Sequence, residues 1–98
     1  MSLPAVYLPE AQDDVDAAYA GYEQRLAGLG ERFLEALRDQ VDRICANPAL
    51  YGVLHQDVRA APMRRFPYIV YYRQEASMVV IIAVQHGRRS WRAWQRRA

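Results

Sequence analysis

Apolar residues in the first half of the chain recur at helical spacing. One stripe, with steps of three or four residues, consists of Ala11, Val15, Ala18, Tyr22 and Leu26. A second stripe consists of Phe33, Leu34, Leu37, Val41, Ile44 and Cys45. Residues 28–30 contain two glycines and separate the stripes, and Pro48 ends the second helix, because proline disfavours helical geometry in the residue before it. The pattern predicts a helical hairpin whose helices start near Pro9 and Glu31.

Strand patterns lie on both sides of the predicted hairpin. Residues 5–8 predict a short first strand, and residues 49–57 predict a loop. Residues 58–65 predict a strand at a sheet edge, because the proline in this segment cannot donate to the ladder. Residues 68–73 are rich in β-branched and aromatic side chains, and the wholly apolar residues 78–84 predict a central strand. The short connections between these strands favour antiparallel pairing.

The predicted elements follow the order β-α-α-β-β-β. This order indicates a single α+β domain over residues 1–98, with the helical hairpin packed on one face of an antiparallel sheet. A short tail, residues 90–98, contains Trp91 and Trp94, and Ser90 is placed to cap a short helix there. We interpret both tryptophans as packing the tail onto the domain, with stacking on nucleic acid as the alternative.

The charge pattern divides the chain in two. All 13 basic residues are arginine. Residues 1–50 carry four arginines and nine acidic residues, a net charge of −5, whereas residues 51–98 carry nine arginines and two acidic residues, a net charge of +7. Such asymmetry favours a nucleic-acid or acidic-protein partner, and a merely solvated charged face is the alternative.

Several classes of protein are excluded by composition. The longest apolar run has seven residues and is too short to span a membrane, which takes about 20 residues. The N-terminal residues do not match a secretory signal. A single unpaired thiol suits a reducing compartment, so we expect a cytoplasmic protein. Cys45 is the only cysteine, which excludes a disulfide framework and, with only two histidines, a structural zinc site. We therefore expect no metal and no cofactor, and we interpret Cys45 as a core residue.

The remaining candidates for chemistry are arginines and one histidine. The arginines of the second half are Arg59, Arg64, Arg65, Arg73, Arg88, Arg89, Arg92, Arg96 and Arg97. An antiparallel sheet would bring their segments together into a shared basic surface that binds phosphates or carboxylates. His86 follows the last predicted strand. It is either a general base or, in the interpretation that we favour, a side chain that bonds locally and orients the turn.

Five motifs in order resemble the ParE/RelE-type toxins of bacterial type II toxin–antitoxin modules. They are LPEA at 8–11, GERF at 30–33, NP at 47–48, RRFPYIVYYR at 64–73 and AVQHGRR at 83–89. The resemblance covers about residues 6 to 96 and implies the same β-α-α-β-β-β fold. It also implies an antitoxin partner that brings acidic and apolar residues to the basic sheet face.

The resembled family holds two activities on one fold. RelE-like members cut mRNA on the ribosome, and ParE-like members bind and block DNA gyrase. RelE members typically carry lysines where this chain has Arg64 and Arg65, an arginine where it has Ile69, and a tyrosine where it has Ala93 or Trp94. Arg89 matches an arginine that they carry after the last strand, and His86 lies close to a histidine that some other nuclease members use.

These differences favour the ParE branch and a function in binding. The predicted partner-binding residues are Arg59, Arg65, Arg73, Arg88, Arg89, Trp91 and Trp94. The alternative is a RelE-like nuclease that acts on the ribosome and mRNA through Arg64, Arg65, His86 and Arg89. A third hypothesis is a non-toxic member that binds only its antitoxin. The sequence leaves open a homodimer or a hetero-oligomer with the antitoxin, and whether residues 1–3 are native.

Overall fold

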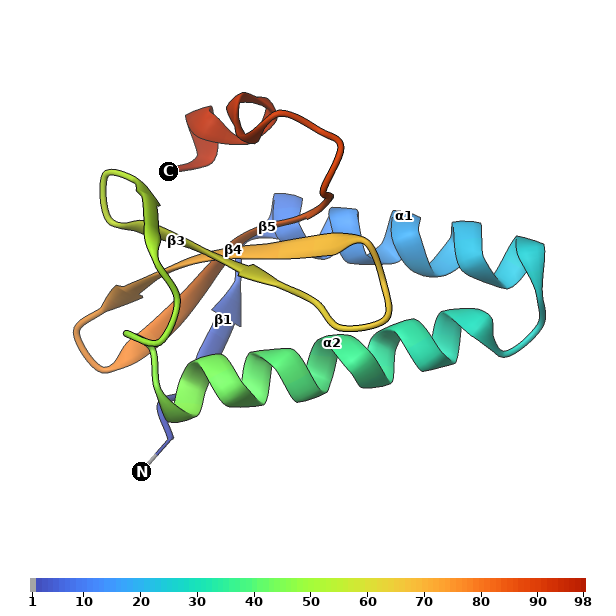
Figure 1. Cartoon of the computed structure of the whole chain (residues 1–98), viewed down its shortest axis with the longest axis horizontal. Coiled ribbons are helices and arrows are strands. Elements are labelled where there is room, and N and C mark those ends of the chain that lie inside the picture. Colours follow the sequence, from blue (N-terminus) through green and yellow to red (C-terminus); the bar gives the residue numbers. More distant parts are fainter. Residues whose placement is uncertain (1) are drawn as a thin grey trace.

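The computed structural model describes residues 2–98 and confirms the predicted α+β fold, with one strand more than expected (Figure 1). Met1, part of the segment whose native origin the sequence leaves open, lies outside the described residues. The elements are β1 (Ala5–Tyr7), α1 (Pro9–Arg25), α2 (Leu29–Ala46), β2 (Val53–His55), β3 (Val58–Pro62), β4 (Tyr68–Glu75) and β5 (Met78–His86). Two single 3-10 turns, Trp91–Ala93 and Gln95–Arg97, form the tail.

The five strands form one sheet in the order β1-β5-β4-β3-β2. β5 lies between β1 and β4, which confirms the predicted central strand. The expectation of a wholly antiparallel sheet is corrected at β1, which pairs parallel with β5. The helices and three other strands separate β1 from β5 in the sequence, so no tight turn forces these two strands to run in opposite directions.

The second edge of the sheet also differs from the prediction. β2 lies within residues 49–57, which were expected to be a loop, because a three-residue strand is too short to show an alternating pattern. β3 is therefore not an edge strand along its whole length. β2 pairs only with Val58 and Arg59, so Pro62 lies beyond the end of β2, where β3 has no second neighbour to accept a donated hydrogen bond.

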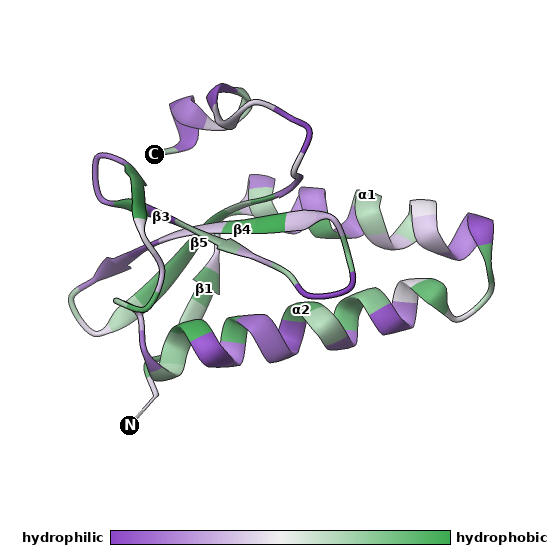
Figure 2. Ribbon diagram, in the orientation of Figure 1, coloured by the Kyte–Doolittle hydropathy of each residue, from purple (hydrophilic) through white to green (hydrophobic). Residues whose placement is uncertain are grey.

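The helices bury their apolar stripes against one face of the sheet, called here the helix face. Phe33 and Ile44 of α2 are fully buried against Val70, Tyr72 and Ile81 of the central strands. Apolar residues predominate in β5, whereas the tail is largely hydrophilic (Figure 2). Cys45 belongs to this core, and burial raises the pKa of its thiol, which favours the unreactive protonated form.

The turn between the helices is held by one carboxylate. Gly28 has a φ of +90°, and the backbone N–H groups of Gly28 and Gly30 donate to Glu23 Oε1 over 3.0 and 2.9 Å. α2 begins at Leu29 rather than near Glu31, because Glu23 satisfies N–H groups that the start of a helix leaves free. Gly30 therefore lies inside α2, where a Cβ atom would come within 2.6 Å of Glu23 Cγ.

Candidate partner-binding surface

A bulge in β5 frees backbone groups to which the C-terminal tail and α1 bind. Ile81 pairs with Tyr72 and Ala83 pairs with Tyr71, so Ile82 is an extra residue in β5. Such a bulge re-aims the backbone groups around it. The carbonyl of Ile82 and the N–H of Val84 accordingly bond to side chains instead of to a strand, beyond the last residue of β1.

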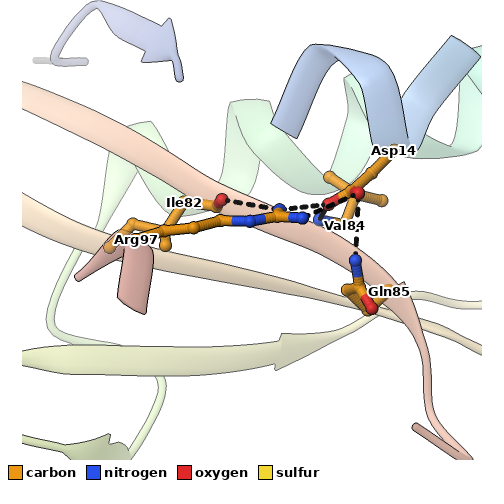
Figure 3. Close-up of polar contacts among 5 residues, drawn as sticks. All are labelled: Asp14, Ile82, Val84, Gln85 and Arg97. Carbon is orange, nitrogen blue, oxygen red and sulfur yellow. Dashed lines mark hydrogen bonds and ion pairs between the residues drawn. The ribbon is translucent and has the colours of Figure 1, made fainter. Parts of the chain in front are cut away.

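Asp14 and Arg97 complete this part of the β5 edge (Figure 3). The Asp14 carboxylate accepts hydrogen bonds from the Val84 N–H at 3.0 Å and from Gln85 Nε2 at 2.9 Å. Arg97 Nη1 donates to Asp14 Oδ2 at 2.7 Å and to the Ile82 carbonyl at 3.2 Å. The carboxylate and the guanidinium are both mostly buried. This network was not predicted, because its members are up to 83 residues apart in the sequence.

Trp94 anchors the tail on the other face of the sheet, called here the tail face. Its side chain is fully buried, and its ring centroid lies 4.4 Å from that of Tyr71. Val58, Ile82 and Ala83 complete this smaller core. The interpretation that the tryptophans pack the tail onto the domain is confirmed for Trp94, which as placed offers no surface to a partner.

The turn after β5 and the tail carry four arginines that form no ion pair with another described residue. We define the C-terminal arginine surface as Arg88, Arg89, Arg92 and Arg96, which are exposed and make no ion pair within residues 2–98. The predicted cap is confirmed, since Ser90 Oγ accepts from the Arg92 N–H at 3.2 Å. Trp91 is half-buried, and its ring centroid lies 4.7 Å from that of His55. These positive charges are available to an acidic partner.

Two other predicted contact residues are already engaged within the domain. Arg59 Nη1 donates to the carbonyl of Tyr51 at 2.6 Å, which ties the segment before β2 to β3. Arg73 forms an ion pair with Glu75 at the end of β4. Their contact with a partner stays a prediction, since each guanidinium gives one nitrogen to an internal acceptor and keeps other N–H donors.

Arg64 and Arg65 lie in the β3–β4 loop beside α2, on the opposite side of the sheet from the tail (Figure 1). They line a groove of about 450 Å³, the α2 groove, whose other charged residues are Arg32, Glu35, Asp39 and Arg43 of α2. Arg65 has a φ of +70°, an uncommon conformation for a residue with a side chain. The arginines of the second half therefore do not share one basic surface.

His86 ends β5 in a third location. Its Nδ1 accepts a hydrogen bond from the Arg88 N–H at 3.0 Å, which confirms the interpretation as a residue that orients the turn. In the neutral ring the proton then lies on Nε2, which is a donor rather than a base. His86 lines a cleft with Tyr68, and Arg64 and Arg65 line the α2 groove, so the hypothetical nuclease residues lie in different cavities.

Comparison with known proteins decides the family. The family model described as "ParE toxin of type II toxin-antitoxin system, parDE" matches residues 5–91. The chain belongs to the ParE toxin family. Among solved structures, it is similar to a chain of the chromosomal ParDE TA system from P. aeruginosa, with 21% identity and a TM-score of 0.66. That similarity covers 87% of this chain and 96% of the other, and it supports the fold. No curated protein gives a significant match.

The ParE family match leaves part of the tail unassigned. It ends at Trp91, so the buried Trp94 and the paired Arg97 lie beyond it. Among the described residues, no group of three or more His, Cys, Asp or Glu side chains is arranged to hold a metal ion. No helix within that part of the chain is long and apolar enough to cross a membrane.

Proposed function

We propose that this ParE-family chain is the toxin of a type II toxin–antitoxin pair and inhibits DNA gyrase by binding it in the bacterial cytoplasm. The observation that carries the proposal is the match of the ParE model to residues 5–91. ParE-like toxins, which the sequence resembles, bind gyrase rather than cutting RNA. The action is therefore association with a target, and it requires a surface rather than a catalytic centre.

The C-terminal arginine surface is our candidate for the gyrase contact. Its four side chains are exposed and free of internal ion pairs among the described residues. Guanidinium groups bind carboxylates through paired donors and stay charged at every physiological pH. The helical hairpin, with its apolar stripes buried on the sheet, would serve as the scaffold that holds this surface in place.

A cognate antitoxin is the second proposed partner. It was expected on a bare basic sheet face, but Trp94 and the tail cover the tail face. Its acidic residues would instead meet the exposed arginines of the tail and, on the other side of the sheet, those of the β3–β4 loop. The partly buried Phe66 of the α2 groove lies next to the loop arginines and would meet its apolar residues. Pairing of arginine with carboxylate would mask the positive charge until the antitoxin is lost.

The RelE-like alternative receives less support from the geometry. Catalysis of RNA cleavage needs a proton acceptor and cations converging on one phosphate. Arg64 and Arg65 line the α2 groove, whereas His86 lines a different cleft, and the Nδ1 atom of His86 is engaged by its own turn. Where RelE members carry tyrosine this chain has Ala93 or Trp94, neither of which has an ionisable hydroxyl, and Trp94 is buried.

Two assays run side by side test the proposal. Purified protein would be titrated into a gyrase supercoiling reaction and into ribosomes programmed with mRNA. We expect loss of supercoiling without cleavage of the message. Cleavage without any effect on gyrase would overturn the proposal in favour of the RelE-like activity. A folded protein, checked by circular dichroism, that binds its antitoxin and is inactive in both assays would identify a non-toxic family member.

A further inference from the structure

A small cleft lies between α1 and the adjoining ends of β4 and β5. Its volume is about 150 Å³. The α1 residues that line it are Ala17, Ala18, Gly21, Tyr22 and Arg25, and the residues from the sheet side are Pro67, Tyr68 and His86. Two alanines and a glycine leave the space open, and the other side chains bring polar groups to it.

Every polar side chain of this cleft can donate a hydrogen bond. The hydroxyls of Tyr22 and Tyr68 and the guanidinium of Arg25 make no side-chain hydrogen bond to another described residue. Arg25 lies over the Tyr22 ring, with Cζ 5.7 Å from its centroid, and has no carboxylate partner in residues 2–98. No aspartate or glutamate is among the described residues that line the cleft.

His86 adds a donor of fixed identity. Because its Nδ1 accepts from the Arg88 N–H, the proton of the neutral imidazole lies on Nε2. The ring lies edge-on to Tyr68, with centroids 5.5 Å apart, which restricts its orientation. The histidine thus has a donor at Nε2, and its acceptor nitrogen is already used within the turn.

Packing holds the two tyrosines in place before any ligand arrives. The ring centroid of Tyr22 lies 5.4 Å from that of Phe33, 5.1 Å from that of Phe66 and 6.1 Å from that of Tyr68. Burial raises the pKa of Tyr22, and the nearby Tyr68 acts in the same direction. Its hydroxyl therefore keeps its proton at neutral pH and remains a donor. Rigid donors lose little conformational entropy on binding.

We propose that this cleft binds a phosphate group through Arg25, Tyr22, Tyr68 and His86. A lining whose polar side chains can all donate, and which has no carboxylate among the described residues, complements an oxyanion, and the small volume suits one phosphate rather than a whole nucleotide. The α2 groove differs in its lining, because Glu35 and Asp39 lie there among the arginines, whereas no carboxylate lines the cleft. The phosphate would be either a free ion or a single phosphodiester of a nucleic-acid backbone. The assignment is independent of gyrase as the target.

Nuclear magnetic resonance titration tests the site directly. Labelled protein at pH 7.5 and constant ionic strength would receive inorganic phosphate, acetate or a dinucleotide with one phosphodiester. We expect saturable shifts of the His86 ring and Arg25 side-chain signals with phosphate, and binding at least about tenfold weaker with acetate. Saturation by the dinucleotide at similar concentrations would identify a nucleic-acid backbone as the source. Saturation by phosphate alone would identify a free ion or a monoester.

Conservative variants separate binding from folding. Tyr22→Phe with Tyr68→Phe keeps both rings and removes both hydroxyls, and it should weaken phosphate binding by about fivefold or more. His55→Gln, which removes an imidazole outside the cleft, should leave the affinity unchanged. Shifts that grow without saturation, equal saturation by acetate, or a double variant that binds as tightly as the parent would overturn the proposal.

Discussion

The two faces of the sheet are covered in different ways. Two long helices cover the helix face and bury a continuous core around Phe33, Ile44 and Ile81. A tail of two single turns covers the tail face through Trp94 and the Asp14–Arg97 pair. The first arrangement spreads its stabilisation over many apolar contacts, and the second concentrates it in a few residues. The difference separates a scaffold from a segment whose docking can be broken on its own.

The largest effect is expected on the helix face. Phe33→Ala removes a fully buried ring that contacts Tyr22, Phe66 and Tyr68. We expect the free energy of unfolding to fall by about 3–5 kcal/mol, because the remaining side chains cannot close the cavity. Urea denaturation followed by circular dichroism measures the loss. A decrease below about 1 kcal/mol would contradict the central place given to this ring.

Trp94→Ala should detach the tail from the sheet and leave the helix face intact. The indole is fully buried, but it lies near the chain end, so the tail can detach without unfolding the helices. We expect rapid amide exchange in residues 91–98, while α2 keeps its protection. The free energy of global unfolding should fall less than for Phe33→Ala. Equal loss of protection in α2 and the tail would show that the two faces unfold as one unit.

The stability of the protein at alkaline pH tests the burial of Tyr7, which packs against the core of the helix face. Burial, as the main cause, raises the pKa of Tyr7 from 10.0 to about 12. The unfolded chain therefore loses this proton first as the pH rises, and stability falls between pH 10 and 12 by an amount on the order of 2 kcal/mol. Tyr7→Phe should lessen that fall in urea titrations at pH 9 and 11. An equal fall in the free energy of unfolding between pH 9 and pH 11 in both proteins would contradict the raised pKa of Tyr7.

Arg97→Met should have the smallest effect on stability. Asp14 keeps its bonds from the Val84 N–H and Gln85 Nε2, so its carboxylate is not left bare. We expect a loss of about 1–2 kcal/mol, below the 3–5 kcal/mol of a fully uncompensated buried charge. Faster exchange should be confined to the tail. A loss as large as that of Trp94→Ala would show that the ion pair, and not the indole, is the main anchor.

The sequence was most informative where a local pattern repeats. The two helical stripes, the apolar β5 and the Ser90 cap were predicted because each depends on neighbouring residues. β2 was missed because three residues carry too little pattern, and the parallel pairing of β1 depends on a distant strand. The Asp14–Arg97 network needs the bulge at Ile82, which no spacing in the sequence shows.

The candidate site was predicted less well than the fold. Positive charge on the second half was evident from composition, but its division among the α2 groove, the His86 cleft and the C-terminal arginine surface depends on tertiary placement. Arg59 and Arg73 are engaged internally because a backbone carbonyl and a carboxylate lie within reach. A list of arginines thus predicts the class of partner, and only the fold separates free guanidinium groups from engaged ones.

The most direct test of the account is the concentration of protein that halves gyrase supercoiling. Arg88→Glu with Arg89→Glu reverses two exposed charges of the C-terminal arginine surface, and Arg38→Glu reverses one exposed charge on α2 as the control. We predict that the double variant needs about tenfold more protein or greater, while the control stays within about twofold of the parent. A double variant that inhibits as well as the parent, or a control that loses as much, would contradict the division into scaffold and contact surface.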